Sequence, residues 1–107
     1  MGRTSRRKPA RLGPKLLHIR QALGLSQNEL IRRLGFDELV QGTISAYESG
    51  RREPSLLVLL AYARAANVSV EALIDDDLCL PERLPCRIRH EGIRRRAERR
   101  KAERHKR

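Results

Sequence analysis

Hydrogen-bonding side chains gather in one short stretch of the sequence, between residues 41 and 52. On a helix over residues 40–49, one face would carry small polar side chains, and two arginines would follow just past its end. These residues are Gln41, Thr43, Ser45, Ser49, Arg51 and Arg52. Side chains of these types at a surface recognise a partner through hydrogen bonds and charge. The stretch therefore predicts a binding face rather than a catalytic centre.

Catalysis and metal binding have no candidate residues in this sequence. His18, His90 and His105 share no spacing with a base or nucleophile that would build a triad. The aspartates and glutamates are scattered, so they predict no acid–base dyad. Cys79 and Cys86 have only His90 as a neighbouring ligand, which is too few for a tetrahedral zinc site. We expect free thiols, the alternative being a disulfide that closes this small loop, and neither enzyme activity nor a cofactor.

The first of two short helices that would position the polar face begins in the motif Ser-Gln-Asn-Glu. Ser26 can accept a hydrogen bond from the amide of Glu29, while the Glu29 side chain reaches back to the amide of Ser26. This reciprocal capping box predicts a helix over residues 27–34. Its apolar face consists of Leu30, Ile31 and Leu34. Gly35 is the expected left-handed stop.

The second short helix is predicted over residues 40–49. Val40, Ile44 and Tyr47 recur at intervals of four and three residues, so this stripe should be buried. Gly50 would end the helix. Two short helices joined by a turn, the second with polar side chains facing outward, form a helix-turn-helix, which places its second helix in the major groove of DNA.

The same stretch resembles a known family. LGLSQNELIRRLG, followed by TISAYESGRREPSLLVLLAYARAANVSVEAL, is similar to the helix-turn-helix domain shared by phage repressors, Cro proteins and Xre-type bacterial regulators. The resemblance covers residues 12–74, roughly two thirds of the chain. It implies a bacterial or phage-type transcriptional regulator that binds duplex DNA in a sequence-specific way.

The resemblance also implies roles for individual residues at the DNA-facing side. Gln27 matches a glutamine that bonds a DNA phosphate and braces the recognition helix. Gln41 matches the first base-reading position, where a glutamine can bond an adenine through two hydrogen bonds. Gly42 and Ala46 match two further base-facing positions. Because these two lack hydrogen-bonding side chains, direct readout would rest on Gln41, Ser45 and apolar contacts with thymine methyl groups.

Other matched positions lie near the DNA backbone or inside the domain. The resemblance places four residues toward phosphate: Thr43, Ser49, Arg51 and Arg52. It pairs Arg20 with Glu48 as a buried ion pair between the first and third helices. Removing either member would strand a buried charge, at a cost of about 3–5 kcal/mol. We expect this pair to be structural, the alternative being a contact with DNA.

The turn between the two helices departs from the family pattern. The family usually has six residues from the glycine of this turn to the isoleucine of the recognition helix, whereas Gly35 and Ile44 are nine apart. The extra residues fall within residues 36–39. A longer connection can change the angle of the recognition helix.

A further helix is predicted before the capping box. Proline suits the first position of a helix, so this helix would begin at Pro14, and it would end at Gly24. Its buried face would consist of Leu16, Ile19 and Leu23.

Two more helices are predicted after the polar stretch. Ser55 would cap a strongly apolar helix that ends at Asn67, and its dense apolar content implies burial on several sides. Ser69 would cap a last short helix over residues 70–75. Together the predicted elements form an all-α bundle, a five-helix repressor-like DNA-binding domain with an aliphatic core.

The net charge of +11 comes from the two ends of the chain. Residues 1–15 hold six basic and no acidic residues, and residues 87–107 hold eleven basic and three acidic ones. Residues 16–86 keep seven basic and ten acidic residues, a net charge of −3. The domain should therefore dock by shape and hydrogen bonds, while the tails add sequence-independent attraction to phosphate.

Charge runs and prolines suggest three segments. We expect a basic flexible arm at 1–11, the DNA-binding domain at 12–78 and a basic flexible tail at 79–107. No apolar run is long enough to span a membrane, and the basic N-terminus lacks the apolar segment of a secretory signal. A cytoplasmic protein is the expectation.

Proteins that resemble this chain commonly bind DNA as homodimers on two half-sites. The expected dimer surface consists of Leu73, Ile74 and Leu78. One alternative function is a protein-interaction adaptor, such as an antitoxin or an anti-repressor partner, which the polar-poor recognition helix and the acidic domain would favour. The other is a sequence-neutral nucleic-acid binder driven by the tails.

Overall fold

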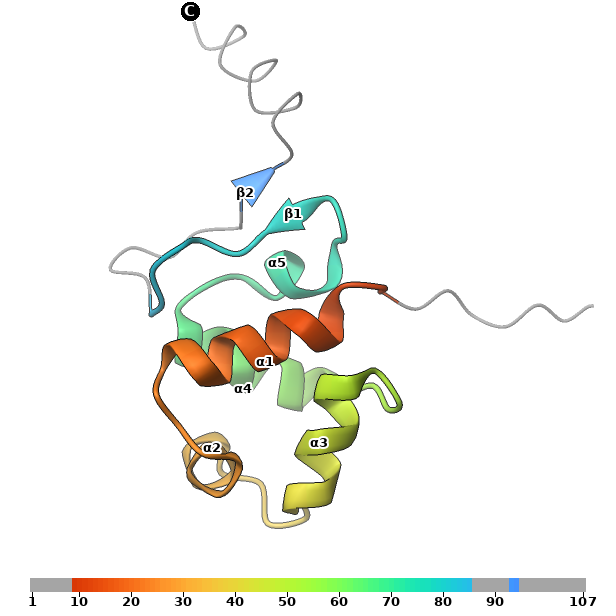
Figure 1. Cartoon of the computed structure of the whole chain (residues 1–107), viewed down its shortest axis with the longest axis vertical. Coiled ribbons are helices and arrows are strands. Elements are labelled where there is room, and N and C mark those ends of the chain that lie inside the picture. Colours follow the sequence, from red (N-terminus) through yellow and green to blue (C-terminus); the bar gives the residue numbers. More distant parts are fainter. Residues whose placement is uncertain (1–8, 86–92, 95–107) are drawn as a thin grey trace, which may run out of the picture.

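The computed structural model describes residues 9–85 and 93–94 of the chain. It contains a bundle of five crossed helices, with one short pair of strands beside it (Figure 1). The elements are α1 (Leu12–Ala22), α2 (Gln27–Leu34), α3 (Gln41–Ser49), α4 (Leu56–Ala66), α5 (Val70–Ile74), β1 (Leu78–Cys79) and β2 (Ile93–Arg94). The all-α architecture predicted from the sequence is confirmed.

The first helix begins earlier than predicted. α1 starts at Leu12, so Pro14 is its third residue rather than its first. Proline is tolerated there because the amides of the first turn have no partner inside the helix. The early start places Gly13 inside the helix. Gly24 adopts the left-handed conformation just after the helix, with φ of 73°.

The ends of α2 are as predicted. The Ser26 hydroxyl accepts from the Glu29 amide at 3.1 Å, and the Glu29 carboxylate accepts from the Ser26 amide at 2.8 Å. These two hydrogen bonds hold the pKa of Glu29 below its ordinary value. Gly35 ends the helix with φ of 82°. Local sequence alone therefore fixes where α2 begins and ends.

The prediction for the start of α3 is wrong at Val40. Ile44 and Tyr47 are buried, as their spacing predicts, but Val40 is 59% exposed. It adopts an extended conformation at the N-cap position, and α3 begins at Gln41. A residue outside the helix does not share the helical periodicity, so its side chain leaves the buried stripe. Gly50 ends the helix in the left-handed conformation.

The caps of α4 and α5 are confirmed, but the burial of α4 is not. Ser55 and Ser69 accept hydrogen bonds from amides in the first turns of these helices, and Asn67 ends α4 in the left-handed conformation. The apolar content of α4 predicts burial on several sides. Instead, Leu56 is 78% exposed and Leu57 is 66% exposed.

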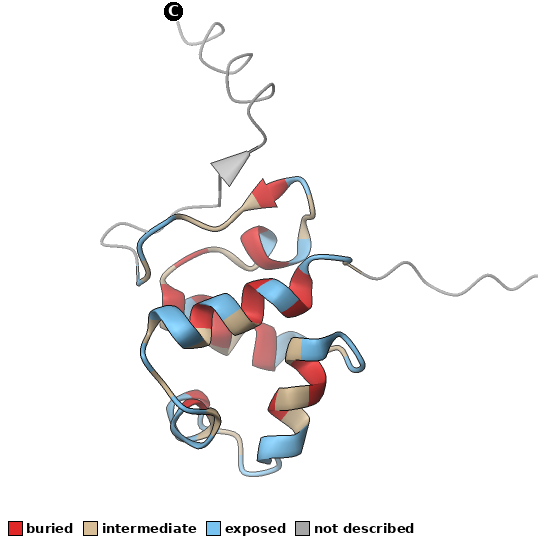
Figure 2. Cartoon of the chain, in the orientation of Figure 1, coloured by how far each residue is buried: buried red, intermediate tan, exposed pale blue. Residues whose placement is uncertain are grey.

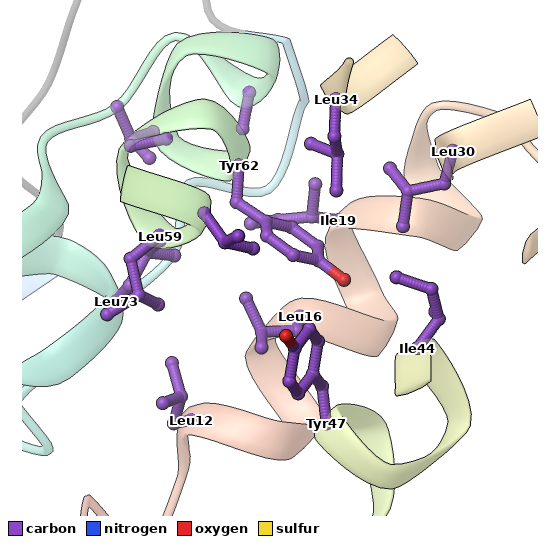
Figure 3. Packing of buried hydrophobic residues seen from close by; sticks show 14 of the residues in the cluster. Leu12, Leu16, Ile19, Leu30, Leu34, Ile44, Tyr47, Leu59, Tyr62 and Leu73 are labelled. Atoms are coloured by element: carbon purple, nitrogen blue, oxygen red, sulfur yellow. The ribbon is translucent and has the colours of Figure 1, made fainter. Parts of the chain in front are cut away.

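The core lies where α1 crosses the other helices, with Tyr62 of α4 at its centre (Figure 3). Tyr62 is fully buried between side chains of α1, α2 and α3, and its hydroxyl lies on the side of Leu30 and Ile44. That hydroxyl has no hydrogen-bond partner among the described residues. Burial raises the pKa of Tyr62 well above its ordinary value. Figure 2 shows that buried positions line the inner faces of all five helices.

The domain extends beyond the predicted boundary at Leu78. β1 pairs with β2 in antiparallel register, with Leu78 opposite Arg94 and Cys79 opposite Ile93, so all of the pair except Leu78 lies in the segment predicted to be a flexible tail. Leu80 and Leu84 pack against the core. The predicted boundary at residue 78 is therefore too early.

The predicted dimer surface is largely interior. Leu73 is fully buried and Leu78 is 5% exposed, so neither can face another molecule. Ile74 alone of the three remains open, at 43% exposure. Leu73 and Leu78 belong to the hydrophobic core of the domain instead.

The predicted arm at residues 1–11 is anchored at its last residues. The amides of Ala10 and Arg11 donate to the Asp76 carboxylate at 2.9 and 3.0 Å, and the Arg11 guanidinium donates to the Asp76 carbonyl. These amide contacts lower the pKa of Asp76. Nearby, the buried Lys15 ammonium donates to the carbonyls of Ala72 and Asp75.

Several expectations concern residues outside the described ranges. These include the arm over residues 1–8, most of the basic tail, and the residues Cys86, His90 and His105. Cys79 lies within the described part and has a free thiol, half-buried beside the Arg11 guanidinium.

Candidate nucleic-acid interface

The N-terminal end of α3 is the most open part of the predicted recognition helix. Gln41, its first residue, is exposed. Gly42 follows, and a Cβ added there would meet none of the described atoms within 4 Å. Val40 adds an exposed apolar side chain just before the helix. In Figure 2 this end of α3 is exposed, whereas its middle is buried against α1.

Further along α3, the predicted contact residues differ in exposure. Thr43 and Ser45 are half-buried, with part of each side chain at the surface. Ala46 is only 7% exposed and belongs to the buried residues. The base-facing role that the resemblance implies for Ala46 is therefore not supported, because its methyl group has little surface to offer. Val40 is the exposed apolar side chain at this helix.

Behind this surface, the Glu48 carboxylate links three helices, α1, α2 and α3. The Arg20 guanidinium of α1 donates to both oxygens of Glu48 on α3, with Nε–Oε2 at 2.6 Å and Nη2–Oε1 at 3.2 Å. Gln27 at the start of α2 donates to the same carboxylate at 3.3 Å. A third Arg20 nitrogen donates to the carbonyl of Leu25. Arg20 and Glu48 thus form the ion pair that the resemblance implies, and Gln27 contacts the same carboxylate. A contact between Gln27 and DNA phosphate stays a prediction.

This network is largely shielded from water. The Glu48 side chain is 8% exposed and the Arg20 side chain is 17% exposed. The hydrogen bond from Arg20 to Glu48 raises the pKa of the guanidinium. Because the pair is bidentate and nearly buried, it fixes the direction of α3 relative to α1. The network thus aligns α3 without occupying its exposed end.

At the other end of α3, a hydroxyl positions an arginine. Ser49 donates to the carbonyl of Ala46 at 3.2 Å and accepts from Nε of Arg51 at 3.0 Å. Arg51 and Arg52 are both exposed. Their amides donate to the carbonyl of Ala46, which wraps the loop over the end of the helix. The loop therefore presents two cations beside α3.

The sequence did not point to Gly13, although α3 depends on it. A Cβ added to Gly13 would lie 2.8 Å from the Glu48 carbonyl oxygen and 3.1 Å from that of Tyr47. Only a residue without a side chain lets the backbones of α1 and α3 approach this closely. The available signal was a glycine one residue before Pro14, which the prediction placed outside the helix.

The long turn between α2 and α3 is anchored to the core. Leu39 is 6% exposed, and Phe36 packs against the core cluster. The Leu39 amide donates to the Phe36 carbonyl at 3.2 Å, which closes a short turn between them. The additional residues therefore form a turn whose two apolar ends, Phe36 and Leu39, pack on the core.

Neither a metal site nor a membrane-spanning helix is found in the described part of the chain. Across 9–85 and 93–94, no group of three histidine, cysteine or acidic side chains could hold a metal ion. None of the helices in those ranges has the length and apolar content needed to cross a membrane.

Comparison with known proteins agrees with the geometry. A family model described as Helix-turn-helix matches residues 16–73, more than half of the chain, from the middle of α1 to α5. No curated protein and no solved structure matches the chain. The matched segment contains α2, α3 and all three members of the Arg20–Gln27–Glu48 network. The chain therefore belongs to the helix-turn-helix family of Xre, Cro and phage-repressor type, whose members are DNA-binding transcription regulators.

Proposed function

We propose that the protein recognises specific duplex DNA sequences by inserting the N-terminal end of α3 into the major groove. The observation that carries this proposal is the contrast along α3. Val40, Gln41 and Gly42 are exposed at its start, while Glu48 near its end is held by two other helices. This arrangement supports recognition because a helix that is held rigidly loses less conformational entropy when its few exposed side chains bind.

The exposed end supplies readout of three kinds. Gln41 can donate to N7 and accept from N6 of an adenine. Gly42 lets the helix approach the bases closely, since it adds no side chain. Val40 and the partly exposed Ser45 would contact thymine methyl groups or base edges. We expect specificity to depend mainly on Gln41, because it is the only residue of this set with a side-chain amide.

Phosphate contacts would surround this readout. Arg51 and Arg52 are exposed in the loop after α3, and Arg51 donates a hydrogen bond to the Ser49 hydroxyl. Thr43 is half-buried on the same helix and is proposed to contact phosphate as well. The basic segments at both ends of the chain would add counterion release, which strengthens binding to any sequence.

We propose that two copies bind a palindromic site. Helix-turn-helix proteins place their recognition helices about 34 Å apart, one turn of DNA, when they bind two half-sites. Of the residues first expected at the dimer surface, only Ile74 is accessible, so any contact there must involve α5 through Ile74.

The test is a selection of randomised duplex DNA with the full chain, at about physiological salt. We expect enrichment of one motif with two-fold symmetry and half-sites about 10 base pairs apart. Binding with no enriched motif would overturn sequence-specific recognition.

A second candidate function is sequence-neutral nucleic-acid binding, which the eleven basic residues of 87–107 favour. Deleting residues 95–107 leaves β2 in place and removes most of this charge. If the tail drives binding, affinity for random DNA should collapse and its salt dependence should flatten. If α3 drives binding, the truncated chain should keep its preference for the selected site over random DNA.

A further inference from the structure

α4 has two apolar faces, only one of which is used by the core. The core face consists of Val58, Leu59, Tyr62, Ala63 and Ala66. The second face consists of Leu57, Leu60, Ala61 and Ala65. A helix that is apolar all round is normally buried all round. Here Leu57 is 66% exposed, so the second face has no complete cover within the described chain.

This second face forms one wall of an open groove of about 470 Å³. The opposite wall comes from Leu34 at the end of α2 and from Phe36 in the turn that follows it. The apolar side chains therefore face each other across a gap rather than lying on a convex surface. Exposed apolar surface of this kind is characteristic of sites where another molecule binds.

The charges beside the groove have one sign. Arg33 from α2 and Arg64 from α4 are both exposed and line it. Every other residue that lines it is apolar, so the groove carries no acidic side chain. The basic segments 1–8 and 95–107 of this chain would be repelled there. A second copy seated two-fold symmetrically would bring in the same two arginines and no carboxylate from its own groove.

We propose that this groove docks an acidic amphipathic helix of a partner protein. Apolar side chains of the partner would enter between Leu57 and Phe36, and its carboxylates would pair with Arg33 and Arg64. Leu57 and Arg64 are seven positions apart, or roughly 10 Å along the helix, so about two turns of the partner would fill the groove. Contacts this small are typical of weak, transient complexes.

The docking site is separate from the proposed DNA-reading residues. None of Val40, Gln41 and Gly42 lines the groove. The inference therefore does not depend on DNA binding, and either proposal can fail without the other.

The experiment uses the full chain and a fluorescein-labelled synthetic helix with leucines along one face and glutamates beside them. Its affinity is measured by anisotropy at about physiological salt, so that attraction to the basic tails is screened. We expect saturable binding, with amide NMR shifts concentrated at Leu57, Ala61 and Arg64. Absence of saturable binding, or shifts confined to the basic tails, would overturn the proposal.

Leu57→Ser tests the apolar contact, and Leu56→Ser is its matched control. Leu56 is even more exposed, at 78%, but does not line the groove. We expect Leu57→Ser to weaken peptide binding about tenfold. The free energy gained by burying a leucine side chain at an interface corresponds to an affinity change of about this size. Leu56→Ser should have little effect. Equal effects of the two changes would contradict the proposed site.

Charge reversal tests the polar contact. The double variant Arg33→Glu, Arg64→Glu should lose the acidic helix and gain affinity for a matched helix with lysine in place of glutamate. Unchanged binding of the acidic helix would overturn the proposal, since the tails would then be its site. Self-association of the unmodified chain that Leu57→Ser abolishes would also overturn it, in favour of a second copy. Affinity for the selected DNA should be unaffected by Leu57→Ser.

Discussion

The inner side of α3 and its exposed N-terminal end differ in how many partners they have. On the inner side, Glu48 receives hydrogen bonds from Arg20 and Gln27, and Gly13 lets the backbone of α1 come within contact. At the N-terminal end, Gln41 is exposed and Gly42 borders open space. The direction of the helix is thus set by buried contacts, whereas the groups proposed to read DNA are exposed and few. Substitutions on the two sides should therefore have different consequences.

The largest loss of stability should come from Glu48→Ala. It leaves the Arg20 guanidinium nearly buried without its carboxylate, and stranding such a charge costs about 3–5 kcal/mol. We expect the lower end, about 3 kcal/mol, because the Arg20 side chain keeps 17% exposure. Urea denaturation measures this loss, with Glu38→Ala as the exposed control. A loss below about 1 kcal/mol would show that the pair behaves as a surface ion pair.

Two glycine-to-alanine substitutions should change the stability of the domain in opposite directions. Gly13→Ala places a methyl group 2.8 Å from the Glu48 carbonyl oxygen, so α3 must shift, at a cost of about 1–3 kcal/mol. Gly42→Ala meets open space and should stabilise α3 by about 0.5–1 kcal/mol. Thermal unfolding of both variants checks the signs. Equal effects would mean that α1 and α3 do not approach closely at Gly13.

Tyr62→Phe should change stability by no more than about 1 kcal/mol, despite its central position. The Tyr62 hydroxyl has no hydrogen-bond partner among the described residues, so its removal breaks no bond and relieves a desolvated group. Chemical denaturation of the variant measures the effect. Destabilisation well beyond 1 kcal/mol would reveal a partner that the described residues do not show.

The smallest effect on stability should come from the contact between residues 10–11 and Asp76, where the chain enters the domain. The amides of Ala10 and Arg11 lower the folded-state pKa of Asp76 below its ordinary 3.8, so the contact contributes stability above that pH. This contribution should be lost as pH falls through the lowered value. NMR titration of these two amides should give a midpoint below 3.8. A midpoint at or above 3.8 would show that the contact is not maintained in solution.

Local signals predicted the helices better than they predicted which faces are covered. Capping serines and left-handed terminators depend on neighbouring residues only, so α2, α4 and the end of α3 were foreseeable. Leu57 and Leu73 carry similar sequence signals, yet one is exposed and the other is fully buried. Their burial depends on which helices cross them, which no local pattern contains.

The candidate site was predicted in outline, with errors at close contacts. The Arg20–Glu48 pair followed from the family resemblance, and the geometry confirms it. Ala46 was assigned to the bases but is buried, and Val40 was assigned to the core but is exposed. The Val40 error comes from the start of α3, because a residue outside the helix does not follow its periodicity. The Ala46 role came from the resemblance, which assigns positions and does not show how deeply a side chain is buried. Gly13 was missed because the need for a glycine arises only from the backbone of another helix.

The central claim is that the open end of α3 reads sequence while its buried side only holds it in place. The direct measurement is the ratio of affinities for the selected site and for random duplex DNA, in Gln41→Ala and in the control Gln21→Ala, which alters an exposed glutamine of α1. We predict that Gln41→Ala lowers this ratio about tenfold, since a bidentate base contact contributes about 1–3 kcal/mol of discrimination. Stability and affinity for random DNA should stay unchanged, as should every property of the control. An unchanged ratio in Gln41→Ala would contradict the claim.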